Sequence, residues 1–225
     1  MKLIHLESNT RQVELECLSE PKDLEIKIIV EANAIFDFYL FANLAQGQSS
    51  VNIDVELVGP EAAFNLIGAY DLREKAQSTW KINIRHLASH THSNVFARGI
   101  GRDKAIGYFK ASVNAAKNLQ VIKAHQKNYN LLLSSQASLF SQPFLEINTD
   151  QIECSHGATV GQLDPNALFY LQSRGISLLE AKQMLTEGFL EDVILKLPNE
   201  SWQKSVRVLM KGQDQAGGQS SCMVS

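Results

Sequence analysis

The feature that most constrains this chain is a succession of short strand-like segments between residues 25 and 158. In several of them apolar and polar residues alternate, so that Trp80, Ile82 and Ile84 share one face. A period of two is the signature of a β-strand. The strands that this pattern predicts cover residues 25–31, 35–42, 51–58, 64–70, 80–88, 93–100, 106–113, 120–126, 129–134, 144–148 and 151–156.

No segment in this region has the length, spacing and caps of a helix that crosses between parallel strands, which excludes βαβ folds. A sandwich, a barrel and a β-solenoid remain. Apolar runs at Ala97–Ile100, Val121–Ala124 and Leu145–Ile147 recur at a spacing of about 24 residues. About two strands per repeat, at a period in the range of 20–30 residues, favour a β-solenoid, whose coils stack on one another. Sparse Gly and Pro between the runs also disfavour tight hairpins.

Composition excludes several classes of protein. The chain has 225 residues, of which 44% are hydrophobic and 20% charged, and its formal charge is −3. This is typical of a globular domain and disfavours general nucleic-acid binding, which needs a basic surface. No apolar stretch approaches the roughly 18 residues of a membrane-spanning helix, and no secretion signal is expected. Three dispersed cysteines, Cys17, Cys154 and Cys222, indicate a reducing compartment, most simply the cytoplasm.

The pattern changes to helical after Gly161. Asp164 and Pro165 are typical of a helix start, and that helix is expected to reach Arg174. Ser177 and Glu180 form a capping box that opens a second helix. A third helix is expected over residues 199–211. The predicted organisation is a lead-in over residues 1–24, a β-helix core over 25–161, a helical domain over 162–212 and a flexible tail over 213–225.

The second helix has an unusually wide apolar arc. Its main stripe is accompanied by four apolar residues off that stripe. An arc this wide can pack on its own domain and also present apolar side chains to a partner. Acidic residues along the helix disfavour DNA binding. The predicted partner-binding residues are Leu179, Leu190, Ile194 and Leu197.

Two further motifs have structural as well as chemical interpretations. His90 and His92 would share one face of a strand, next to His86, as a two-ligand metal clip or as an exposed polar corner. The Gly99-x-Gly101 pair precedes strand-like residues rather than a helix, which favours a turn over a phosphate loop.

The stretch from Gln151 to Thr159 is the most informative one. Cys154 and His156 lie two residues apart, so on a strand both side chains point the same way. A thiolate beside an imidazole is half of a site for a soft metal or an iron–sulfur cluster. The alternative is a core thiol and a hydrogen-bonded core histidine, because Ile152 has the same parity. The C-terminal Cys222 stands in a sequence that formally matches a prenylation motif. A chance match is the simpler explanation.

Several ordered motifs resemble the C-terminal half of the SufB/SufD family of iron–sulfur cluster assembly proteins, over roughly residues 80–198. They are Asn130–Ser134, Pro143–Ile147, Cys154–Gly161, Leu168–Ile176, Glu180-Ala181 and Gly188-Phe189. The Cys-Ser-His-Gly-Ala-Thr form is similar to the SufD branch.

The resemblance implies a right-handed parallel β-helix followed by a small helical domain. It implies a non-enzymatic cytoplasmic scaffold that pairs with a SufB-like subunit and a SufC-like ABC-type ATPase, the latter through the C-terminal helices. It also implies that His156, with Cys154 as a neighbouring candidate, shares a transient iron–sulfur cluster with SufB, so no tightly bound cofactor is expected in the isolated chain. Typical members carry a longer N-terminal region, which predicts a shortened β-helix here.

Two alternatives remain open at this point. One is a structural module without metal chemistry, which includes a homodimer of the isolated chain. The other is a β-helix enzyme acting on polysaccharide, which would need aligned charged side chains on the solenoid flank and usually a secretion signal.

Overall fold

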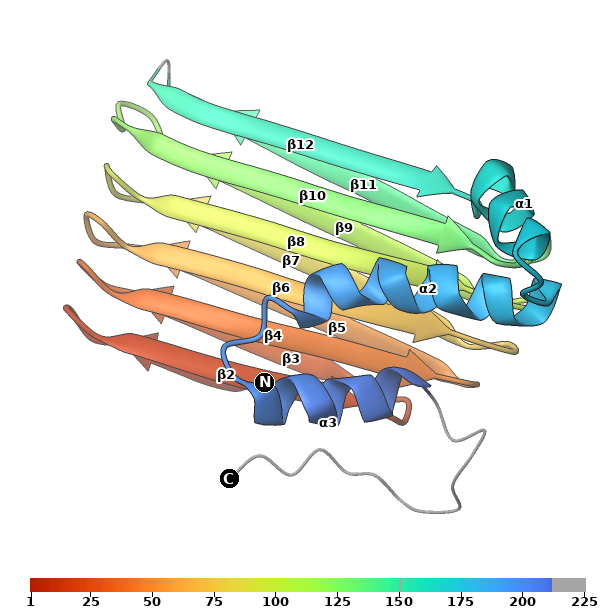
Figure 1. The fold of residues 1–225 in the computed structure, drawn as a ribbon. Helices are drawn as coiled ribbons and strands as arrows, with labels where there is room; N and C mark the ends of the chain where they lie inside the picture. The colour runs from red at the N-terminus through yellow and green to blue at the C-terminus, as the bar shows by residue number, and fades with distance from the viewer. Residues whose placement is uncertain (150, 212–225) are drawn as a thin grey trace.

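The chain forms a parallel β-solenoid followed by three helices in a computed structural model that describes residues 1–149 and 151–211 (Figure 1). Successive strands alternate between two six-stranded parallel sheets, so odd-numbered strands form one sheet and even-numbered strands the other. The predicted solenoid is therefore confirmed. The strands are β1 (Lys2–Leu6), β2 (Arg11–Leu18), β3 (Leu24–Val30), β4 (Ile35–Leu44), β5 (Gln48–Leu57), β6 (Ala63–Leu72), β7 (Gln77–His86), β8 (His92–Gly101), β9 (Ile106–Ala115), β10 (Ile122–Leu132), β11 (Ser138–Ile147) and β12 (Ile152–Gly161).

The core lies between the two sheets and follows from the alternation in the sequence. On β7, Trp80, Ile82 and Ile84 are buried, whereas Lys81 and Arg85 between them are exposed. The same register positions are apolar in neighbouring coils, so side chains stack in rows along the solenoid axis. Burial of these rows is the main driving force for the fold.

The repeat is longer than the 24-residue spacing of the apolar runs, although it lies within the expected range of 20–30 residues. Gln48 pairs with Gln77, and Gln77 pairs with Ile106, each at a spacing of 29 residues. The prediction aligned Ala97 with Val121, but the structure pairs Ala97 with Asn128. The prediction was wrong because Asn128 is a buried polar residue, which hides the true register from a search for apolar runs. For the same reason, the two strands predicted at 120–126 and 129–134 are one strand, β10.

The first coil consists of residues that the sequence analysis treated as a lead-in. β1 and β2 continue the two sheets at one end. They were not predicted from the sequence, and in β2 the alternation is inverted, with glutamates rather than apolar residues at the core-facing positions. Glu14 and Glu16 pair with the core positions Phe38 and Leu40, so their side chains face the solenoid interior. Lys2 bonds to Glu14 at 2.7 Å, and a second lysine, Lys22, bonds to Glu16 at 3.0 Å. Inward-pointing charges of this kind discourage further strands from pairing with an edge.

The helices begin where the sequence predicts. α1 (Pro165–Ser173) is capped by the Asp164 side chain, and α2 (Leu178–Ile194) has the complete Ser177–Glu180 capping box. α3 (Glu200–Lys211) follows, with the Asn199 side chain accepting from the backbone N–H of Trp202 at 2.9 Å. α2 lies along β6 and β8, and α3 lies on β4 (Figure 1). None of the described helices is long and apolar enough to cross a membrane.

Candidate functional site

β12 is the last strand of its sheet and carries both predicted metal ligands. Cys154 pairs with Ala124 of β10, and His156 pairs with Gln126. Ala124 and Gln126 are buried core-face residues, and register partners in parallel strands point the same way. Cys154 and His156 therefore share the face that is turned toward the opposite sheet, as their spacing predicts.

The two side chains are nevertheless exposed. In the earlier coils this face is buried by the next coil, but the structure describes no strand beyond β12. The interpretation of Cys154 and His156 as core residues is thus correct for the direction in which they point but wrong for their burial. A thiol and an imidazole lie on one face at this end of the solenoid, here called the open end, beside the edge of β12 that pairs with none of the described strands.

Polar residues lie in the solenoid interior directly below this end. The Tyr70 hydroxyl donates to Asn130 Oδ1 at 2.7 Å, Asn130 donates to Asn128 Oδ1 at 2.6 Å, and Asn128 donates to the carbonyl oxygen of Ala97 at 3.3 Å. A Cβ on Gly99 would lie 2.2 Å from Asn130 Oδ1, so only glycine fits beside this network. The interior becomes polar just before the last coil, which the apolar pattern of the sequence did not indicate.

The site as described supplies two ligands. No three His, Cys, Asp or Glu side chains among residues 1–149 and 151–211 converge to hold a metal ion. Iron in iron–sulfur clusters takes four protein and sulfide ligands, with cysteine the usual protein ligand. The described residues alone therefore do not complete a ligand set around Cys154 and His156.

The three histidines of the 86–92 cluster separate into two environments. His86 is fully buried, between Thr91 and Ser93. The Thr91 hydroxyl donates to the Ala88 carbonyl oxygen at 2.9 Å, so it accepts from the His86 Nδ1–H at 2.7 Å, and Nε2 accepts from the Ser93 hydroxyl at 2.9 Å. Burial and then the neighbouring His92 lower the pKa of His86 to about 4. His86 is therefore a neutral structural residue.

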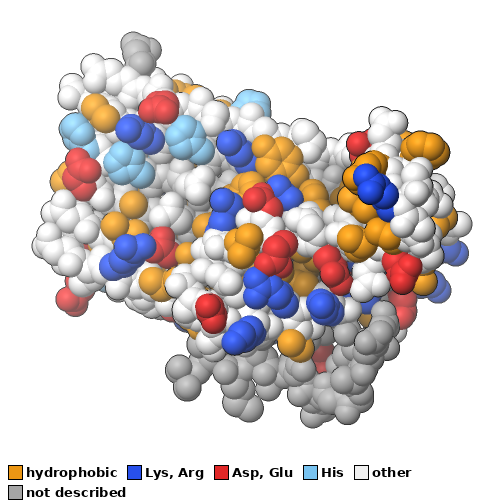
Figure 2. Space-filling model, in the orientation of Figure 1, with side chains coloured by type: hydrophobic (Ala, Val, Ile, Leu, Met, Phe, Trp, Pro, Cys, Tyr) orange, Lys and Arg blue, Asp and Glu red, His pale blue; other side chains and the backbone are white. Residues whose placement is uncertain are grey.

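His90 and His92 are exposed, and an acidic residue from the preceding coil approaches both of them. Glu61 Oε1 lies 3.8 Å from His90 Nδ1, and Glu61 Oε2 lies 3.8 Å from His92 Nε2. Figure 2 shows histidines gathered with lysine and acidic side chains over one end of this face. These three side chains do not form a metal centre as placed. The sequence could not indicate Glu61, because stacking of coils brings it to the histidines.

The Gly99-x-Gly101 pair forms no phosphate loop. It ends β8, and the chain turns through Asp103, whose φ is 47°. Arg102, which directly follows Gly101, donates two hydrogen bonds to the buried carboxylate of Asp71 through Nε and Nη2. The Nε–Oδ1 distance is 2.9 Å. The predicted turn is present, but it follows the two glycines, which themselves belong to β8.

The predicted partner-binding residues fall into two groups. Leu190, Ile194 and Leu197 are at most 5% exposed, because they pack on outward-facing residues of the even-numbered sheet such as Phe41. The prediction is wrong for these three, since spacing alone cannot tell which side of a wide apolar arc packs on its own sheet. Leu179 is 78% exposed. It lies with other exposed apolar side chains of the first two helices, here called the α1–α2 surface: Phe169, Tyr170, Leu178, Leu179 and Met184.

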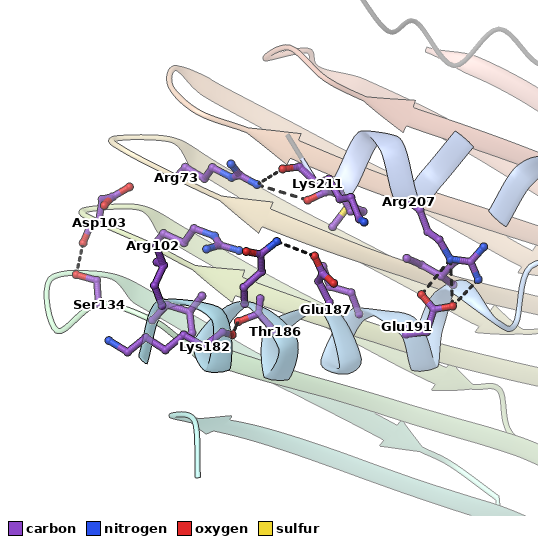
Figure 3. Close-up of a pocket in the computed structure, with 16 residues that line it drawn as sticks. Arg73, Arg102, Asp103, Ser134, Lys182, Thr186, Glu187, Glu191, Arg207 and Lys211 are labelled. Atoms are coloured by element: carbon purple, nitrogen blue, oxygen red, sulfur yellow. Dashed lines mark hydrogen bonds and ion pairs between the residues drawn. The ribbon is translucent and has the colours of Figure 1, made fainter. Parts of the chain in front are cut away.

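A cavity of about 660 Å³ lies where α2 and α3 meet the ends of the strands (Figure 3). Two arginines that line it hold the helices in place. Arg207 of α3 bonds to Glu191 of α2, with Nε 3.1 Å from each carboxylate oxygen. Arg73 donates to the carbonyl oxygens of Met210 and Lys211 at the end of α3, both at 3.4 Å. The cavity therefore lies in a polar interface between the helices and the solenoid. Cys154 and His156 are not among its lining residues.

Cys222, with its formal prenylation motif, and the predicted tail over residues 213–225 lie outside the described residues.

Comparison with known proteins agrees with this architecture. The sequence model described as "SUF system FeS cluster assembly, SufBD core domain" matches residues 25–189. A SufBD family protein of iron–sulfur cluster assembly from Synechocystis sp. is 35% identical over 181 residues, covering 73% of this chain and 40% of that protein. The SufD proteins of Escherichia coli and Bacillus subtilis are 34% and 30% identical, over 62% and 60% of this chain and 32% and 31% of those proteins.

The chain spans at most 40% of the length of these relatives. The family match nevertheless covers well over half of the chain and includes the strands of the solenoid from β3 onward, the Cys154–His156 motif and the start of α2. The chain belongs to the SufB/SufD family of iron–sulfur cluster assembly proteins, as a SufD-like member.

Proposed function

We propose that the chain is a non-catalytic, SufD-like scaffold subunit of cytoplasmic SUF cluster assembly. In this proposal it pairs with a SufB-like subunit at the open end of the solenoid. There His156, with Cys154 beside it, contributes to binding iron or a nascent cluster that the two subunits share. The cluster is cargo that is passed on, so the isolated chain has no need of a complete ligand set.

The observation that supports this proposal is the placement of two soft-metal ligands on the core-facing side of an uncovered last coil. A partner that pairs with β12 or covers the last coil would bring its own side chains next to them, because edge strands pair readily with a second chain. The glutamates at the other end of the solenoid make that end a poorer docking site.

We further propose that a SufC-like ATPase docks on the α1–α2 surface. Five apolar side chains are exposed there on two helices, and Leu179 is the most exposed of them. Since α2 and α3 pack on the outer face of the even-numbered sheet, movement of the helices by an ATPase would act directly on that sheet.

The test is a His156→Ala variant in a reconstituted system with SufB-like and SufC-like partners. We expect the complex to assemble but to retain less iron and to deliver clusters more slowly. The matched control is His125→Ala, on the outer face of the same sheet, where His125 Nδ1 contacts Ser155 Oγ at 2.8 Å. Normal cluster delivery by His156→Ala in an intact complex would refute the assignment.

A second candidate function is a structural homodimer without metal chemistry. The outer edges of β11 and β12, which pair with no other described strand, also support it. Anaerobic reconstitution with iron and sulfide separates the two. Visible absorbance of a cluster that requires both this chain and a SufB-like partner supports the scaffold. A stable homodimer that never acquires this absorbance, with or without the partner, supports the structural module.

A further inference from the structure

Gln126 has no hydrogen-bond partner in the described part of the chain, although its side chain is almost completely buried. It is 2% exposed, and both Nε2 and Oε1 lack a partner. Buried polar groups in folded proteins are nearly always hydrogen-bonded, so an amide with both atoms unpaired requires an explanation. The interior residues that follow it on β10, Asn128 and Asn130, are bonded to each other.

The stacking of coils restricts the partners that Gln126 can find. In its own row, Gln126 lies between Val95 of β8 and His156 of β12. Val95 is apolar, and the next interior residue on the same strand, Asn128, is already bonded to Ala97 and Asn130. His156 is thus the polar side chain stacked directly on Gln126. Because His156 is exposed, its ring is free to turn toward the amide.

We propose that Gln126 is a positioning residue for His156. Its Oε1 accepts the N–H of one imidazole nitrogen, which fixes that proton and directs the lone pair of the other nitrogen to the open end of the solenoid. A neutral imidazole has one donor and one acceptor nitrogen, so a hydrogen bond to one determines the role of the other. Histidines that bind metals generally donate their second N–H to an oxygen in this way. The consequence for metal binding rests on the function proposed above.

This arrangement distinguishes His156 from His125, its neighbour on the outer face of β10. The Nδ1 of His125 already lies 2.8 Å from the Ser155 hydroxyl, and its ring points away from the interior. Ser141 of β11 carries another unpaired hydroxyl and faces the interior from the opposite sheet, because its register partner is the buried Phe109. It is the alternative partner for the amide.

The experiment measures the imidazole tautomer of His156 by nitrogen NMR in the full chain, anaerobically and at a pH where the ring is neutral. A His156→Asn variant assigns the signal. We expect one tautomer to dominate in the wild type and the tautomer ratio to change by about five- to tenfold in Gln126→Met, as loss of one net hydrogen bond predicts. Gln126→Leu is the second variant, in case methionine disturbs folding.

The matched control is Gln142→Met, the same change at an exposed residue of β11 in the last coil. An unchanged His156 tautomer in folded Gln126→Met and Gln126→Leu overturns the inference. A change in Ser141→Ala that equals the change in Gln126→Met also overturns it, because the hydroxyl would then be needed to position the ring.

The inference and the proposed function can fail separately. If the Gln126 variants change the tautomer while His156→Ala delivers clusters normally, Gln126 positions His156 but His156 is not a cluster ligand. If the tautomer is unchanged and His156→Ala loses iron, the function stands without Gln126. If Gln126 positions His156 and His156 is a cluster ligand, the Gln126 variants should lower iron retention in the reconstituted complex by about 10- to 100-fold.

Discussion

The imidazole of His86 is a titratable group in the solenoid core, between two hydroxyl groups that suit only its neutral form. Thr91 accepts from one ring nitrogen and Ser93 donates to the other. Protonation would require Ser93 to reorient and would place a charge in the core. At the residue scale, the fold therefore selects one tautomer and one protonation state.

Because the pKa of His86 falls from 6.5 to about 4 on folding, the unfolded chain binds an additional proton between these pH values. The stability that His86 contributes is thus complete above pH 6.5 and is lost as the pH falls toward 4, by about 3 kcal/mol. Urea unfolding at pH 7.5 and 4.5 measures this loss. We expect His86→Gln to reduce the pH dependence and exposed His90→Asn to retain it. An equal dependence in both variants would contradict the assignment.

At the scale of single elements, local signals place the helices and packing decides which of their faces are used. Asp164, Ser177 and Asn199 cap the three helices as the sequence indicates, because a cap depends only on a few adjacent residues. The buried side of α2 depends instead on the sheet beneath it. The sequence therefore located α2 but assigned Leu190, Ile194 and Leu197 to the wrong surface.

The capping box provides a test at this scale. Ser177→Ala removes the bond from the backbone N–H of Glu180 to Ser177 Oγ, at 3.3 Å, and the side-chain bond at 2.7 Å to Glu180. We expect the first turn of α2 to lose about 1 kcal/mol of stability. Hydrogen exchange of the amides of α2 measures this loss. Ser201→Ala, at an exposed serine in the first turn of α3, is the control, and equal exchange in the two variants would argue against the cap.

At the scale of the whole molecule, the two ends of the solenoid are chemically different. The first coil directs Glu14 and Glu16 inward and neutralises them with lysines. The last coil presents Cys154, His156, Ala158 and Val160 on the corresponding face, with no Asp, Glu, Lys or Arg among these four residues. The end formed by the first coil therefore disfavours pairing with a second chain, and the end formed by the last coil favours it.

This difference predicts where assembly is sensitive to mutation. Val160→Lys places a charge at the open end, where Val160 is 44% exposed, and should abolish pairing with a SufB-like partner, as measured by analytical ultracentrifugation. Val13→Lys makes the same change on β2 at the opposite end, where Val13 is 39% exposed, and should leave pairing intact. Loss of pairing in Val13→Lys alone would place the interface at the wrong end of the solenoid.

The sequence by itself determined the β-solenoid class, the caps, the family and the shared face of Cys154 and His156, since each of these depends on adjacent residues or on ordered motifs. Only the tertiary structure decided which residues stack on one another. It aligned Ala97 with Asn128, brought Glu61 to His90, and placed Gln126 beneath His156. Contacts between coils join residues about 30 positions apart, and polar residues inside the solenoid hide that register from any search for apolar periodicity.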